Sequence, residues 1–126
     1  MSTKTVKNSL RFRISKNKSG QLEFKSIVKH PMENGFRRDK TSGQLVPPDF
    51  IENFTVSIDG VECIDLQLSA NVSKNPFFLF DFTKPVIDGQ LVNVTWVDNR
   101  GAIVSYDSTI AFDNKHAHNF TGQYTP

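Results

Sequence analysis

The sequence predicts an all-β fold, an immunoglobulin-like antiparallel β-sandwich of about seven strands. Three observations support this prediction. Apolar residues alternate with polar ones along several short segments, as they do in half-buried strands. Turn-forming residues separate these segments at close intervals, and no segment has the apolar period of an amphipathic helix. With 126 residues, the chain is long enough for one domain with its own core.

The first two strands are predicted to form a hairpin with a basic outer side. Segments 10–14 and 22–28 alternate apolar and polar residues. Their outward positions, and the position just after the second segment, carry four cations: Arg11, Arg13, Lys25 and Lys29. If the apolar sides match, Arg13 lies opposite or close to Lys25, and like charges in that arrangement repel each other. We therefore hypothesise that these cations face an anion or an acidic partner; the alternative is an ordinary solvated basic face.

Charge is unevenly distributed along the chain. Up to Lys40 there are eleven Lys and Arg residues against three Asp and Glu, and from Thr41 onward there are four against ten. Such asymmetry suggests an anion-facing end and a cation-facing end. Nucleic acid is not favoured as a partner, because no aromatic residues are interleaved with the basic ones on the predicted outer side.

A long connection, 30–48, follows the second strand. Proline, glycine and asparagine recur along it, and Pro31 keeps the preceding residue out of the helical region. Structured loops of this length are usually functional or interaction elements. This one mixes soft apolar and guanidinium groups, which are enriched at interfaces. The hypothesised partner contacts are His30, Met32, Phe36, Arg37 and Arg38. The alternative is an ordinary surface crossover between two sheets.

The second half of the chain predicts five further strands joined by tight turns. Asp59-Gly60 and the tetrapeptide 98–101 are hairpin turns. The strands are segments 54–58, 64–70, 77–82, 92–96 and 104–112. The sandwich domain is thus predicted over 10–112. Residues 1–9 are predicted to be a flexible N-terminus. The polar, aperiodic residues 113–126 are predicted to be an extended tail that is frayed unless a neighbour orders it.

The phenylalanine-rich strand is apolar on both faces. Successive side chains of a strand point to opposite faces, so Phe78, Phe80 and Phe82 line one face while Phe77 and Leu79 project from the other. A second apolar face must be covered, either by loops of the same chain or by a partner subunit. Phe77 and Leu79 are therefore hypothesised to contact a partner.

No residue pattern indicates catalysis, and no cofactor or metal site is predicted. Cys63 is the only cysteine. It lies in a predicted strand without a flanking glycine or basic neighbour, and it points outward unless a bulge shifts the register. We interpret it as structural or incidental. No apolar run is long enough to span a membrane. Residues 1–7 are not followed by the apolar region of a secretory signal, which taken alone predicts the cytoplasm.

Three stretches of the sequence resemble the SoxZ family, the small subunit of the SoxYZ sulfur-compound carrier of thiosulfate oxidation. They are HPMENGFRRD at 30–39, VSKNPF at 72–77 and VTWVDNRG at 94–101. The stretch VPPDFI at 46–51 also fits. The resemblance runs from about Leu10 to Phe112, with the motifs in the family's order.

This resemblance implies a non-catalytic, immunoglobulin-like subunit that pairs with SoxY. In the family, a glycine-flanked cysteine near the C-terminus of SoxY holds the sulfur intermediate. The resemblance also implies transient contact with other Sox enzymes. It implies a periplasmic location reached by export together with SoxY, in place of the cytoplasm. No catalytic residue is implied, and a homo-oligomer of the isolated chain is an open alternative.

Two rival functions stay open at this stage. A free-standing adhesion or ligand-binding sandwich would not associate stably with a SoxY-like chain. A small metal-dependent redox enzyme would carry a metal when purified. The family resemblance favours the carrier subunit over both.

Overall fold

The computed structural model describes residues 9–16, 21–112 and 119–124. Its eight antiparallel strands form two four-stranded sheets, which confirms the predicted β-sandwich, with one strand more than expected. The strands are β1 (Leu10–Lys16), β2 (Leu22–Val28), β3 (Ile51–Ile58), β4 (Val61–Gln67), β5 (Phe77–Asp81), β6 (Leu91–Asp98), β7 (Ile103–Thr109) and β8 (Phe120–Tyr124). No helix formed by the described residues is long and apolar enough to cross a membrane.

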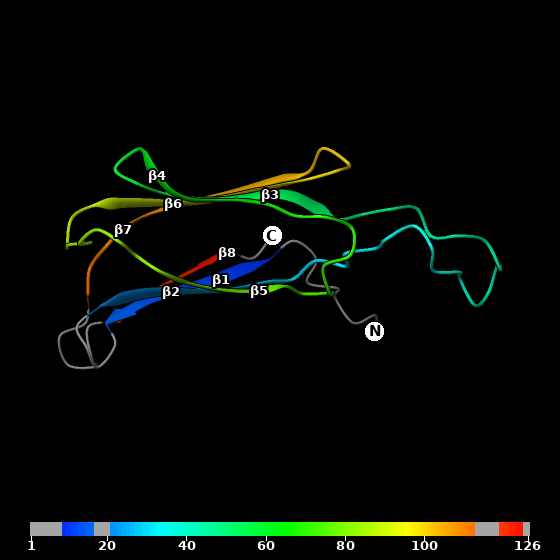
Figure 1. Cartoon of the computed structure of the whole chain (residues 1–126), viewed down its shortest axis with the longest axis horizontal. Coiled ribbons are helices and arrows are strands. Elements are labelled where there is room, and N and C mark those ends of the chain that lie inside the picture. Colours follow the sequence, from blue (N-terminus) through cyan, green and yellow to red (C-terminus); the bar gives the residue numbers. More distant parts are fainter. Residues whose placement is uncertain (1–8, 17–20, 113–118, 125–126) are drawn as a thin grey trace.

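The two sheets are stacked as the two layers seen in Figure 1. The first sheet has the strand order β5-β2-β1-β8, and the second has β4-β3-β6-β7. The inward side chains of both sheets form one core, whose largest buried members are Trp96, Phe12, Phe24 and Phe54. The ring centroids of Phe24 in β2 and Phe54 in β3 lie 6.3 Å apart, so aromatic packing joins the layers. The core thus forms without any disulfide, since Cys63 is a free, exposed thiol.

The predicted hairpins have the register that the sequence indicated. Arg13 lies directly opposite Lys25 in the β1–β2 pair. Asp59 and Gly60 have φ angles of 50° and 80°, and positive φ at both central residues is typical of a type I′ hairpin turn. A register shift lies between Val56 and Ser57 in the β3–β4 pair. Even with this bulge, the side chain of Cys63 is exposed, as predicted.

The prediction of a frayed C-terminal tail is wrong for residues 120–124. They form β8, which pairs antiparallel with β1 at the edge of the first sheet. Gly122 explains how the strand fits: a Cβ placed on it would come 2.3 Å from the ring of Phe12. Only a residue without a side chain lets this backbone lie so close to the core. Residues 1–8, 113–118 and 125–126 lie outside the described residues.

Candidate functional site

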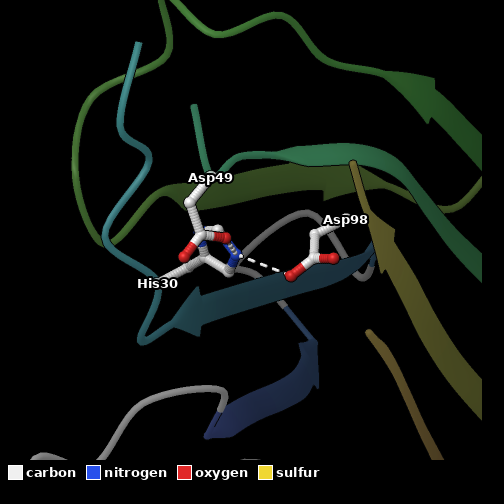
Figure 2. A group of neighbouring side chains, drawn as sticks. All are labelled: His30, Asp49 and Asp98. Atoms are coloured by element: carbon white, nitrogen blue, oxygen red, sulfur yellow. Dashed lines mark hydrogen bonds and ion pairs between the residues drawn. The ribbon is translucent and has the colours of Figure 1, made fainter. Parts of the chain in front are cut away.

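Three buried polar side chains meet at one end of the sandwich, and we call them the clasp: His30, Asp49 and Asp98. His30 follows β2 and is 1% exposed. Its Nε2 atom lies 3.3 Å from Oδ2 of Asp98 at the end of β6 and 3.4 Å from Oδ1 of Asp49. Figure 2 shows the three side chains together, with a dashed line from His30 to Asp98. The clasp therefore joins the long connection after β2 to the second sheet.

A backbone contact fixes which imidazole nitrogen carries the hydrogen. The N–H of Met32 donates to Nδ1 of His30 at 3.1 Å. Because Nδ1 accepts this bond with its lone pair, the ring hydrogen lies on Nε2, which faces the carboxylates. Met32 reaches this position with a φ of 48°, a left-handed conformation that is uncommon for a residue with a side chain. His30 thus donates to Asp98, and Oδ1 of Asp49 lies 3.4 Å from the same nitrogen.

The same three residues have the composition of a metal site, since their ligand atoms lie within 4.8 Å of one another. A histidine that binds a metal through one nitrogen normally donates its other ring N–H to an acceptor. Here the other nitrogen, Nδ1, is itself an acceptor, so Nε2 presents a hydrogen in place of a lone pair. The arrangement fits an internal hydrogen-bonded cluster better than a cation site.

The motifs that resemble the SoxZ family converge on the clasp. The N–H of His30 donates to Oδ1 of Asn75 at 3.0 Å, and the N–H of Asn75 donates to the carbonyl of His30 at 3.0 Å. Asp98 accepts the N–H groups of Arg100 and Ala102 at 2.9 and 2.8 Å. Segments that are far apart in the sequence are therefore held together by reciprocal polar contacts at one point.

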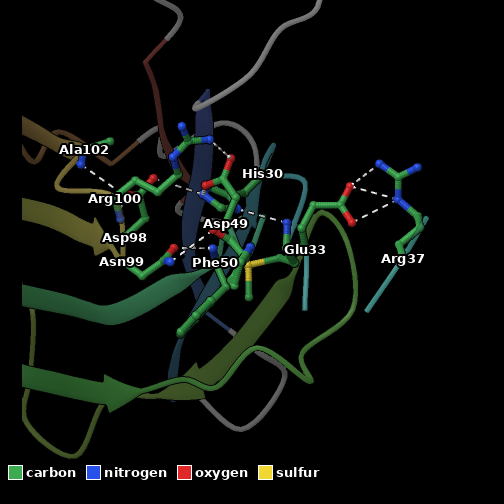
Figure 3. Close-up of polar contacts among 11 residues, drawn as sticks. His30, Glu33, Arg37, Asp49, Phe50, Asp98, Asn99, Arg100 and Ala102 are labelled. Atoms are coloured by element: carbon green, nitrogen blue, oxygen red, sulfur yellow. Dashed lines mark hydrogen bonds and ion pairs between the residues drawn. The ribbon is translucent and has the colours of Figure 1, made fainter. Parts of the chain in front are cut away.

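Further contacts around the clasp fasten the end of the long connection, as Figure 3 shows. Asn99 accepts the N–H of Phe50 at 2.8 Å and donates to the carbonyl of Pro48 at 3.1 Å. Arg100 places Nη1 3.8 Å from Oδ2 of Asp49. The start of the long connection thus contacts the end of β6 through His30 and Asp98, and its end contacts the β6–β7 turn through Asn99.

Residues 33–49 form a projecting arm beyond the clasp (Figure 1). Backbone hydrogen bonds pair Glu33 with Asp49 in both directions, at 2.7 and 3.0 Å, so the arm leaves and re-enters the sandwich at one place. A further isolated bridge pairs Arg38 with Leu45. Nearly every residue of the arm tip is exposed, and Phe36 is 80% exposed. The arm is a structured hairpin that packs little of itself against the sandwich.

Charged groups of the arm are bonded within the arm. Arg37 and Glu33 form a charge-assisted pair with a shortest N–O distance of 2.6 Å, and this contact lowers the pKa of Glu33 and raises the pKa of Arg37. The N–H groups of Ser42 and Thr41 lower the pKa of Asp39 by binding its carboxylate. Arg38 donates to the carbonyl of Gly43 at 2.9 Å. These bonds order the exposed arm.

The outer face of the first sheet brings together the two residue sets that the sequence suggested separately. Phe77 and Leu79 in β5 are 61% and 53% exposed. Leu79 is paired with Lys25, which in turn faces Arg13. Phe77 is paired with Ile27, which faces Arg11. Lys29, just after β2, is exposed as well. Apolar and basic side chains therefore lie side by side on one surface.

A shallow groove of about 310 Å³ crosses this face. Apart from the inward-facing Phe12 and Ser26, its lining comes from outward residues of all four strands: Arg11, Arg13, Lys25, Ile27, Phe77 and Thr121. A groove with both guanidinium groups and an aromatic ring suits protein side chains, because it offers apolar area and charge together.

The seven hypothesised interface residues fall into two groups. Phe36, Arg37, Arg38, Phe77 and Leu79 are exposed, and their role as partner contacts stays a prediction. His30 and Met32 are buried inside the sandwich end, so these two side chains anchor the arm and do not present surface. Met32 also places its sulfur 3.4 Å from the N–H of Ile51, which it accepts.

Cys63 is exposed on β4 and lines a cavity of about 350 Å³ between β4 and the segment after β5. In the sequence, no basic residue is adjacent to Cys63. In the structure Lys84 lines the same cavity, brought there by the loop that follows β5. The thiol makes a weak contact of 3.5 Å with the carbonyl of Val61. No glycine-rich arm carries it.

Sequence reasoning missed the clasp. His30 was assigned to an interface, and Asp49 and Asp98 were not singled out. The available signal was the position of all three residues inside or beside the stretches that resemble one family. Buried polar side chains usually have polar neighbours, and here Nε2 of His30 lies within 3.4 Å of both carboxylates.

The fold and these sites together define a β-sandwich with a buried polar cluster at one end, a projecting arm, and an outer sheet face that carries exposed apolar and basic side chains. A family model described as "Sulphur oxidation protein SoxZ" matches residues 10–109. The chain therefore belongs to the SoxZ family of sulfur-oxidation proteins, as the resemblance predicted. A comparison with curated proteins gave no match.

Proposed function

We propose that this chain is the non-catalytic subunit of a SoxYZ-type sulfur carrier. It pairs with SoxY, whose C-terminal cysteine holds the thiosulfate-derived intermediates for the periplasmic sulfur-oxidation enzymes. Family membership supports this function. The observation that carries it is the exposure of Phe77 and Leu79 on an open sheet face, beside a set of cations. An apolar sheet face of this kind is expected to be covered in the working assembly.

The environment of Cys63 supports a division of labour between the two subunits. A cysteine that delivers cargo to several active sites needs a flexible arm. Cys63 instead lies within β4, between Glu62 and Ile64. We therefore place the reactive sulfur on SoxY. Mass spectrometry after turnover with thiosulfate should find adducts on SoxY and none on Cys63.

The arm adds a second contact surface. Phe36 is an exposed aromatic side chain on a hairpin whose base is fixed by the clasp. Aromatic residues and arginine are enriched among the residues that dominate binding energy at interfaces. We assign Phe36, Arg37 and Arg38 to contacts with SoxY or, transiently, with other Sox enzymes. The complex would work in the periplasm, reached by export together with SoxY.

The test is co-purification of the chain with SoxY from the same organism. Replacing Phe77 and Leu79 together by alanine should remove most of the heterodimer, because two exposed apolar anchors are truncated. The fold should be retained, since neither side chain belongs to the core. Thermal unfolding of the isolated variant checks this point.

A matched control removes equally exposed apolar side chains from the second sheet. Val61 and Ile103 are 61% and 66% exposed, and their alanine variants should leave the heterodimer intact. Unchanged co-purification of the Phe77 and Leu79 variant would refute the interface assignment. A wild-type chain that forms no 1:1 complex with SoxY would instead favour the free-standing adhesion or ligand-binding module.

A further inference from the structure

Charges on the outer face of the first sheet are sorted into rows across the strands. One row places Lys25 of β2 opposite Arg13 of β1, next to Leu79 of β5. The neighbouring row in one direction along the strands is Phe77, Ile27 and Arg11. The neighbouring row in the other direction is Asp81, Glu23 and Ser15. The face therefore has a basic and apolar part and an acidic end.

In each of the two rows that contain charged pairs, two side chains of like charge lie opposite each other on neighbouring strands. Arg13 faces Lys25, and Glu23 faces Asp81. Within the described part of the chain, none of these four side chains takes part in an ion pair. Like charges directly opposite each other on a sheet are unfavourable. A surface that tolerates two such pairs is expected to be compensated from outside.

We propose that this face admits the partner subunit in one orientation only, because basic side chains lie in one part of the face and acidic side chains at one end. The inference rests on the proposed function. The partner surface would place carboxylates over Arg11, Arg13 and Lys25, and apolar side chains over Phe77 and Leu79. It would place a basic group over Glu23 and Asp81. Turning the partner around would bring like charges together, which is unfavourable in a desolvated interface.

The groove argues for a protein surface as the occupant. A small inorganic anion would contact only the cations and leave Ile27 and Phe77 in water. A protein segment with both carboxylates and apolar side chains uses the whole lining. A second copy of this chain carries the same two kinds of row, and it is the alternative that the experiment separates from the partner subunit.

The experiment measures the affinity of purified SoxY for two charge-reversed variants by calorimetry at 50 and 500 mM NaCl. One variant is R13E/K25E, and the other is E23K/D81K. Each should bind SoxY about tenfold or more weakly at low salt, because each turns complementary contacts into repulsive ones. High salt should shrink both losses, since screening weakens exposed charge interactions.

Controls change the net charge equally at places off this face. K74E/K84E matches R13E/K25E, and D65K/D107K on the second sheet matches E23K/D81K. Both controls should bind like the wild type. Circular dichroism confirms that each variant folds; where a reversal prevents folding, the neutral variants R13Q/K25Q and E23Q/D81N replace it and should lose affinity by a smaller factor.

Several outcomes would overturn the inference. Equal losses in the controls would mean that net charge alone matters. A loss in only one of the two variants would remove the bipolar arrangement. Charge variants that bind SoxY normally but change self-association in the ultracentrifuge would assign the face to a second copy. Wild-type chain that does not bind SoxY at all would overturn the proposed function too, whereas unchanged binding of the variants overturns this inference alone.

Discussion

Polar side chains on the outer faces of the two sheets differ in whether they bond to one another. On the second sheet they bond to one another across the strands: Asn93 donates to Asp107 at 2.7 Å, and Thr95 and Ser105 share a contact of 2.9 Å. Asn53 likewise donates to Asp65 at 2.8 Å. These polar side chains of the second sheet thus find their partners within the chain.

On the first sheet the corresponding positions carry like charges opposite each other and exposed apolar rings. Arg13 faces Lys25, and Phe77 projects into solvent beside Ile27. The β1–β2 and β6–β7 pairs that carry many of these side chains are both antiparallel and have no register shift, so pairing in these two hairpins does not cause the difference. The second sheet therefore satisfies these polar groups within the chain, whereas the first sheet leaves like charges and apolar side chains exposed, which agrees with the proposed partner contact.

The clasp offers the test with the largest expected effect, because the hydrogen bonds that Asp98 accepts are buried or half-buried within the chain. Replacing Asp98 by alanine leaves two backbone N–H groups and Nε2–H of His30 without their acceptor. Unsatisfied buried donors are expensive, so the free energy of unfolding should fall by about 3 kcal/mol. Urea denaturation of the isolated chain measures this change.

The control for Asp98 is Asp107, an exposed carboxylate of the second sheet that accepts a bond from Asn93. Asp107→Ala should lower the free energy of unfolding by less than about 0.5 kcal/mol, because water replaces the lost partner. Equal losses in the two variants would contradict the structural role given to the clasp.

The edge strand β8 offers the next test of the first sheet, because it pairs with β1 beside Arg11 and Arg13. In Gly122→Ala the new methyl group would meet the rings of Phe12 and Tyr106, at 2.3 and 2.8 Å from their nearest atoms. Overpacking of this kind should lower the free energy of unfolding by about 2 kcal/mol. Thermal and urea unfolding measure it, with Thr121→Ala on the exposed side of the same strand as a near-neutral control. A Gly122→Ala protein as stable as the wild type would mean that β8 does not lie against Phe12.

Much of the fold was predictable from the sequence because its signal is local. Alternation along 10–14 and 22–28 assigns inner and outer faces, and a short hairpin fixes the pairing of Arg13 with Lys25. Phe78 and Phe82 were assigned to the same face of their strand, and both are buried in the core. The exposure of Phe77 and Leu79 follows from the same period of two.

What the sequence did not predict depends on contacts between distant segments. His30 and Asp98 are 68 positions apart, and nothing local indicates that one donates to the other. Gly122 interrupts the apolar pattern of Phe120 and Tyr124, and its reason is the ring of Phe12 in another strand. The approach of Lys84 to the cavity of Cys63 likewise depends on the loop after β5.

The smallest expected effect is also the one that separates stability from function most directly. In Arg13→Thr the guanidinium that faces Lys25 is lost, and threonine suits an exposed strand position. Relief of like-charge repulsion should raise the free energy of unfolding of the isolated chain by a few tenths of a kcal/mol. The same change should weaken binding of SoxY.

Arg11→Thr is the matched control: Arg11 faces Ile27, so its removal relieves no opposing charge and should give no such gain in the free energy of unfolding. If this face binds a partner, removing its like-charge repulsion should stabilise the isolated chain and weaken the association. An Arg13→Thr protein that is less stable than the Arg11→Thr protein would contradict this interpretation.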